Sequence, residues 1–137
     1  MSTSYANLQE FITQHKATLA RQLAQTLFDT HLLPPEINLE EIIPFQETWL
    51  DTIAGYLVSG DVDNVSSQVK ISTREQVAAG FTTAYLQTTN TIFYTGIKTL
   101  VEQELNQPEQ AITRQQFLRR IESIRTLSSI AIITALI

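Results

Sequence analysis

The sequence predicts an all-α fold of about five or six helices, two of them long and in the C-terminal half. Apolar residues recur every three or four positions over most of the chain, and glycines or prolines fall between these stretches. No window alternates apolar and polar residues for long enough to predict a strand. The length of 137 residues is that of one domain, which can bury a substantial core without a disulfide or a metal.

A long N-terminal helix is predicted from Tyr5 to about His31, either as one unit or as two helices that meet near His15. Pro34 and Pro35 should end it, because proline disfavours a helical residue before it and donates no backbone hydrogen bond. The apolar residues of its inner face are Leu8, Phe11, Ile12, Leu19, Leu23 and Leu27.

Two further helices are expected before the middle of the chain. Residues 39–43 should form a single turn, after which Pro44 occupies the first turn of a helix. The inner face of this helix comprises Phe45, Trp49, Ile53, Tyr56 and Leu57. Gly60 closes it, and Asp61 caps another helix that reaches Ala79. The β-branched residues of this third helix lower its intrinsic propensity, so tertiary contacts should stabilise it.

The chain is organised around a helix predicted from Thr83 to Leu105, which follows a glycine. Gly80 stands where the preceding helix needs a left-handed residue, a conformation that glycine adopts without strain. Thr82 or Thr83 can cap the next helix by accepting a backbone N–H. The broad apolar stripe of this helix includes Tyr85, Leu86, Thr89, Ile92, Phe93, Gly96, Ile97, Leu100 and Val101.

A final helix is predicted after a turn at residues 106–109, with Thr113 as its cap and Gln116 as the capping-box partner. Its inner side comprises Phe117, Ile121, Ile124, Leu127, Ser128, Ala131 and Ala135. Its last turns lack Gly, Pro and basic residues and are apolar on several sides. Three interpretations stay open: the chain is the front piece of a longer protein, a second copy buries this end, or the end packs on its own core.

Composition excludes several classes of function. The net charge is −5, which makes the chain a poor candidate for binding nucleic-acid phosphates. The absence of cysteine excludes disulfides, thiolate metal ligands and cysteine nucleophiles. The longest apolar run, near residues 130–137, is far shorter than the roughly 20 residues that span a bilayer. The start, MSTSYANLQEF, lacks the pattern of a signal peptide, so we expect a cytoplasmic protein without a membrane span.

No set of residues predicts catalysis or a resident cofactor. His15 and His31 have no second ligand at a metal-binding spacing, and no His or Met follows His31 to serve as an axial haem ligand. We expect His15 to be a core or boundary residue of the first helix. The sequence has no GxSxG, GxGxxG or Walker pattern, and its paired carboxylates fall at expected helix ends or turns. We therefore expect no enzyme, no metal site and no cofactor.

Two groups of side chains are candidates for binding, and each has a simpler interpretation. Trp49, Tyr85 and Phe93 either line a small apolar pocket or are ordinary core residues. The four arginines at the start of the last helix either dock an acidic partner or form a solvated face, balanced by Glu109 and Glu122. These arginines are Arg114, Arg119, Arg120 and Arg125.

Three stretches carry a family resemblance: the opening FITQHKATLARQLAQTL, the segment SGDVDNV, and TREQVAAGFTTAYL with the long helix after it. Together they resemble the N-terminal domains of RsbR-type stressosome proteins and related bacterial sensor proteins. Arg74, Gly80 and residues 81–86 stand in the places of that family's Arg-bearing helix, its glycine and the capped turn that follows. The resemblance covers most of the chain.

The resemblance implies a globin-like helical fold that lacks haem and pairs as a homodimer. It implies that residues 1–137 form a single sensor or input domain, the N-terminal fragment of a longer cytoplasmic signalling protein that continues into a downstream domain such as STAS. The family offers no catalytic residue. Its phosphorylated threonines belong to the STAS part, so none is assigned to this chain.

We therefore expect a non-catalytic sensory domain that acts through dimerisation and protein contacts. Two copies would pair through their long C-terminal helices, and a signal would shift this pairing. The dimer and relay candidates are Phe117, Ile121, Ile124, Ile130, Ile133 and Leu136. The alternative is a helical domain that binds a small ligand or cofactor among Trp49, Tyr85 and Phe93.

Overall fold

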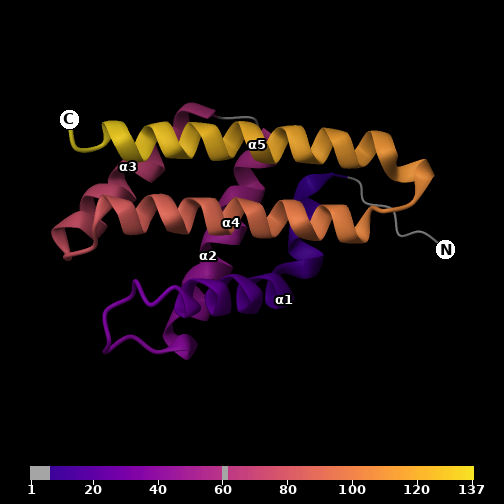
Figure 1. Cartoon of the computed structure of the whole chain (residues 1–137). Helices are drawn as coiled ribbons and strands as arrows, with labels where there is room; N and C mark the ends of the chain where they lie inside the picture. Colours follow the sequence, from indigo (N-terminus) through magenta and orange to yellow (C-terminus); the bar gives the residue numbers. More distant parts are fainter. Residues whose placement is uncertain (1–6, 60–61) are drawn as a thin grey trace.

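The structure is a computed structural model that describes residues 7–59 and 62–137. Within these ranges it contains five α-helices, one short 3₁₀ helix and no strand, which confirms the predicted all-α class (Figure 1). The elements are α1 (Leu8–Asp29), α2 (Leu39–Ser59), α3 (Val62–Ala78), α4 (Thr83–Glu104), the 3₁₀ helix η1 (Pro108–Gln110) and α5 (Ala111–Thr134). No helix in the described part of the chain is long and apolar enough to cross a membrane.

Helix α1 is one continuous helix past His15, so the single-helix interpretation is confirmed. Asn7 caps its start, because the Asn7 side chain accepts a 2.9 Å hydrogen bond from the backbone N–H of Glu10. At the other end the hydroxyl of Thr30 donates to the carbonyl of Leu27 at 2.6 Å. His31 follows with a left-handed φ of 59°, so the helix ends before the prolines are reached.

The prediction for α2 was wrong at its start. Residues 39–43 are the first turn of a helix that continues through Pro44, rather than an isolated turn. The signal that sequence reasoning missed is Asn38, whose side chain accepts from the backbone N–H of Glu41 at 3.1 Å and caps the helix.

The buried face of α2 is also shifted from the one predicted. Phe45, predicted to face inward, is 75% exposed, and the neighbouring Gln46 is buried. The buried positions of the described side chains of α2 are Ile42, Ile43, Gln46, Leu50, Ile53 and Ala54, which fit a helical period. The expected closure at Gly60 and Asp61 lies outside the described residues.

The glycine break and the cap of the central helix are confirmed. Gly80 has φ 103°, and the backbone N–H of Phe81 returns to the carbonyl of Gln76 at 3.0 Å, which closes the end of α3. Thr82 then caps α4 by accepting from the backbone N–H of Tyr85 at 3.0 Å. In α3 the side chains of Val65, Val69 and Thr73 are buried, whereas the side chain of Val62 is outside the described set.

The start of the last helix was also predicted wrongly. Thr113 lies inside α5 and does not cap it, because the chain already turns helically at Pro108. Proline suits a first helical turn, where its missing N–H has no partner to lose. The side chain of Gln110 accepts from the backbone N–H of Gln107 at 3.2 Å, which completes this start.

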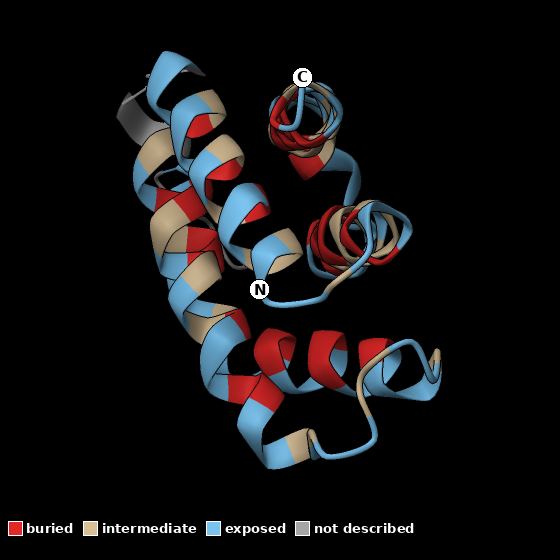
Figure 2. Ribbon diagram, turned by 90° about the vertical axis from the view of Figure 1, so that its left-hand side faces the viewer, coloured by how far each residue is buried: buried red, intermediate tan, exposed pale blue. Residues whose placement is uncertain are grey.

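Helices α4 and α5 lie side by side and antiparallel, while α1 packs on both α2 and α4, and α3 packs mainly on α5 (Figure 1). Buried residues gather on the faces that the helices turn toward one another (Figure 2). Gly96 lets α4 pack tightly on α1, because a Cβ atom there would lie 2.5 Å from Cδ2 of Leu23. A glycine is therefore needed at this helix crossing.

Replacing Gly96 with alanine tests this crossing, and Gly55 provides a matched control. A Cβ atom on Gly55 would meet nothing within 4 Å, so Gly55→Ala should stabilise the protein by up to about 1 kcal/mol through helix propensity. Gly96→Ala gains the same propensity but forces Leu23 to move, and overpacking of this kind costs about 1–3 kcal/mol. Urea denaturation should therefore show Gly96→Ala as the less stable variant, and equal stabilisation by both would contradict the close crossing.

Candidate functional site

A cavity of about 430 Å³ lies between α2, α3 and the N-terminal half of α4. This volume falls in the range of about 300–1,000 Å³ that small-molecule pockets occupy. Trp49, Tyr85 and Phe93, the three aromatic residues that the sequence nominates for a pocket, all line it. The other apolar side chains of its wall are Leu27, Leu33, Ile37, Ile42, Phe45, Val69, Phe81, Leu86 and Ile132.

The aromatic side chains of the wall form two pairs. The rings of Trp49 on α2 and Phe93 on α4 have centroids 6.4 Å apart and planes inclined at 59°. Phe81 in the turn before α4 stacks on Tyr85, with centroids 4.9 Å apart. Burial raises the pKa of Tyr85 above its ordinary value, and a hydrogen bond with Thr89 opposes this shift. The cavity wall therefore includes two pairs of packed aromatic rings.

Most polar groups of the wall already have partners inside the protein. The hydroxyl of Thr73 donates to the carbonyl of Val69 at 2.7 Å, and that of Thr89 donates to the carbonyl of Tyr85 at 2.9 Å. In α3 the amide of Gln76 donates to the hydroxyl of Ser72 at 2.8 Å. These groups are stabilised without any ligand.

Gln46 is a buried polar residue of the wall that has no such partner within the described part of the chain. Gln46 is only 8% exposed and lines the cavity, yet its carboxamide makes no hydrogen bond with the described residues. No side-chain nitrogen or oxygen atom that is sealed from solvent lacks a partner in the described part of the structure. The Gln46 amide is therefore reached through the cavity rather than sealed in the core. Sequence reasoning missed this residue because a glutamine in the middle of a helix carries no signal of its own.

Neither histidine belongs to the cavity. His15 is half-buried on α1 with its ring centroid 4.8 Å from that of Phe11, which fits the predicted boundary role. His31 is exposed after the end of α1. The described residues contain no cluster of three His, Cys, Asp or Glu side chains that could hold a metal ion. The cavity wall thus provides apolar contact and hydrogen bonds rather than metal ligation.

The four arginines of α5 do not act as one basic face. Arg114 donates to the carbonyl of Leu105 at 2.6 Å and thereby holds the end of α4. Arg125 pairs with Glu122 on its own helix. Arg119 and Arg120 are exposed. Two of the four are therefore used within the chain.

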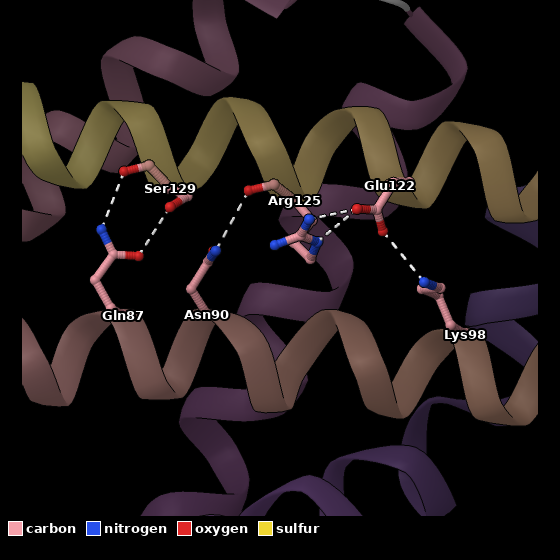
Figure 3. Close-up of polar contacts among 6 residues, drawn as sticks. All are labelled: Gln87, Asn90, Lys98, Glu122, Arg125 and Ser129. Carbon is pink, nitrogen blue, oxygen red and sulfur yellow. Dashed lines mark hydrogen bonds and ion pairs between the residues drawn. The ribbon is translucent and has the colours of Figure 1, made fainter.

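A line of polar contacts joins α4 to α5 (Figure 3). The side chain of Gln87 donates to the carbonyl of Ser129 at 3.1 Å, and the Ser129 hydroxyl donates back to Gln87 at 3.0 Å. Further along, the amide of Asn90 donates to the carbonyl of Arg125 at 3.3 Å, and Lys98 pairs with Glu122 at 3.2 Å. The recurrence of polar residues at helical spacing on α4 is the sequence signal that would have found this face.

Two titratable groups belong to this α4–α5 contact. The phenol of Tyr94 lies 3.2 Å from the hydroxyl of Ser128 in the core, and burial raises its pKa well above the ordinary value. Hydrogen bonds from Arg125 and then from Lys98 lower the pKa of Glu122 from 4.5 to about 2. Both hydrogen bonds favour the charged form of Glu122.

The dimer and relay candidates divide into two groups. Phe117, Ile121 and Ile124 are buried in the core of this chain, whereas the other three lie on its surface. The exposed ones are Ile130 at 53%, Ile133 at 61% and Leu136 at 48%. Near the same end, the guanidinium of Arg74 on α3 donates to the carbonyl of Ala135 at 2.9 Å. The end of α5 is therefore held by α3 while it presents apolar side chains to solvent.

No protein-family model matches the chain, and neither the curated proteins nor the solved structures contain a match to it. The cavity and the contacts around it are therefore the basis for the functional argument.

Glu122→Gln tests the ion pairs that Glu122 forms with Arg125 on its own helix and with Lys98 on α4. A carboxylate whose folded pKa of about 2 lies below its ordinary 4.5 stabilises the protein above pH 4.5 and loses this effect as the pH falls toward 2. The side chain of Glu122 is 42% exposed, so the effect should not exceed about 1 kcal/mol at pH 7.

Glu102→Gln is the matched control, since Glu102 is exposed on α4 and forms no ion pair within the described residues. Chemical denaturation at several pH values should show a deficit for Glu122→Gln at pH 7 that shrinks in acid. Identical stability curves for the two variants at every pH would contradict the contact.

Proposed function

We propose that this chain is a non-catalytic regulatory domain of the RsbR-like sensory class, and that it binds a small apolar molecule in the cavity between α2, α3 and α4. The observation that supports this proposal is the cavity itself, whose wall receives side chains from each of the five described α-helices. A ligand there can contact side chains of several helices, so its binding can change how these helices pack. A ligand shifts such an equilibrium only if it binds one arrangement better than the other.

The link from the cavity to the end of α5 passes through α3. Val69 and Thr73 line the cavity, and α3 packs on α5 with its Arg74 bound to the carbonyl of Ala135. Ile132 of α5 also contributes to the wall, next to the exposed Ile133. A ligand that changes the position of α3 therefore changes the support of the last turns of α5.

The exposed side chains at the end of α5 are where we place the contact with a second copy. Ile130, Ile133 and Leu136 are the candidates for this contact, since the other three predicted candidates belong to the core. The proposal includes a globin-like arrangement without haem and a role in a cytoplasmic signalling assembly, with a downstream domain such as STAS. Signals would reach that domain through the pairing of the two copies.

Ligand binding is tested with N-phenyl-1-naphthylamine, an uncharged apolar fluorophore, with the lone Trp49 as the reporter. Its binding should quench Trp49 fluorescence saturably at one site per chain, because Trp49 forms part of the wall. Val69→Phe should fill part of the cavity and weaken binding by about tenfold, or 1.4 kcal/mol.

Ile71→Phe makes a comparable change on the same helix at an exposed position that does not line the cavity, and it should leave binding unchanged. Circular dichroism checks that both variants fold. The proposal fails if no saturable response occurs, or if the two variants respond alike.

Pairing is tested by light scattering at high micromolar concentration. The wild-type chain should have the mass of a dimer, and Ile133→Asp should dissociate it because a charge cannot be buried in an apolar contact without a partner. Ile112→Asp, at a 74% exposed site at the other end of α5, should remain dimeric. A monomeric wild type, or equal dissociation by both substitutions, would show that the end of α5 does not pair.

A further inference from the structure

The charges around the cavity restrict the class of ligand that it can take. Among the described residues that line it, Glu75 alone is charged, and Glu75 is exposed. No Lys, Arg or His belongs to the described wall. An anionic ligand would lose water from its charged group without gaining a cation, which is unfavourable in an apolar site. The net charge of −5 adds to this penalty for an anion.

A cationic ligand has little to gain either. Glu75 is exposed to solvent, so its attraction for an ammonium group is screened and weak. Apart from Glu75, no described residue of the wall carries a negative charge that could pair with an ammonium group. Both signs of charge are thus disfavoured in the interior of the cavity.

The carboxamide of Gln46 indicates that the ligand needs a hydrogen-bonding group. Gln46 is more than nine-tenths buried, lines the cavity and has no hydrogen-bond partner in the described structure. A carboxamide has both donor and acceptor atoms, and a ligand that covers them without bonding to them leaves them unsatisfied. Of the other polar side chains of the wall, Thr73 and Gln76 already have partners, and Thr48 and Glu75 are exposed to solvent.

The position of Gln46 orients such a ligand. Gln46 and Trp49 are three residues apart on α2 and therefore share one face of the helix. The Trp49 ring packs on that of Phe93, with centroids 6.4 Å apart, and both rings line the cavity. A molecule that bonds to Gln46 can thus place its apolar part against both rings.

We infer that the cavity takes an uncharged, mainly apolar molecule with one hydrogen-bonding group, such as a primary amide or an alcohol, which pairs with the carboxamide of Gln46 while its apolar body packs on Trp49 and Phe93. This inference rests on the proposed function of the same cavity. It adds the charge and the polar group of the ligand, which the proposed function leaves open.

Three probes of equal chain length separate charge from apolar contact: decanamide, decanoate and decylamine, each titrated into the full chain at pH 7 by calorimetry. Decanamide should bind at least about tenfold more tightly than either charged probe. Naphthalene, which has no hydrogen-bonding group, serves as the purely apolar reference.

Gln46→Met tests the polar contact, because methionine is similar in size but cannot pair with an amide. The variant should fold at least as stably as the wild type, since it removes an unpaired buried group. It should weaken decanamide binding by about tenfold and leave naphthalene binding unchanged.

The outcomes separate this inference from the proposed function. If decanoate or decylamine binds as tightly as decanamide, the cavity is a ligand site but the inference about charge is wrong. If Gln46→Met binds decanamide as well as the wild type does, Gln46 does not pair with the ligand. If neither naphthalene nor any decyl probe binds, the proposed ligand site itself is wrong.

Discussion

The packing of α4 between α1 and α5 is the constraint on which the rest of the structure depends. On one side Gly96 lets Leu23 of α1 approach closely, and on the other Tyr94 meets Ser128 of α5 in the core. The polar pairs of Gln87 with Ser129 and of Lys98 with Glu122 fix the register of the same two helices. Helix α3 packs mainly on α5 and only slightly on α4, and a cavity lies between α2, α3 and the first half of α4.

That space has physical properties that favour a ligand. Its wall is mainly apolar, and most of its polar groups are already paired, so it offers few sites where water could make the three or so hydrogen bonds typical of a buried water molecule. Side chains that face an empty volume also lose dispersion contacts. A molecule that fills the cavity restores those contacts and stabilises the folded state by mass action. Because Arg74 of α3 bonds to the carbonyl of Ala135, a change in α3 can alter the exposed end of α5.

Much of the fold could be predicted from the sequence, because helical periodicity and local capping are encoded locally. Gly80 ends α3 and Thr82 caps α4, as the conformational preferences of the two residues indicate. The errors arose where a local rule has two solutions. Pro44 was assigned to a first turn but lies inside a helix, and Thr113 was assigned as a cap but lies inside α5, which follows the 3₁₀ turn that starts at Pro108.

The site was harder to predict than the fold. Its aromatic residues followed from composition and spacing, whereas the exposure of Phe45 and the burial of Gln46 depend on how α2 rotates against its neighbours. The absence of cations from the described wall depends on five helices at once, so no local sequence pattern could reveal it.

We propose that a ligand bound in the cavity alters the end of α5 through its effect on α3. Amide hydrogen exchange in the presence and absence of saturating decanamide tests it directly. Bound decanamide should slow amide exchange in α3 and in the last turns of α5, as well as in the segments of α2 and α4 that line the cavity. Slower exchange confined to α2 and α4, with α3 and the end of α5 unchanged, would contradict the account.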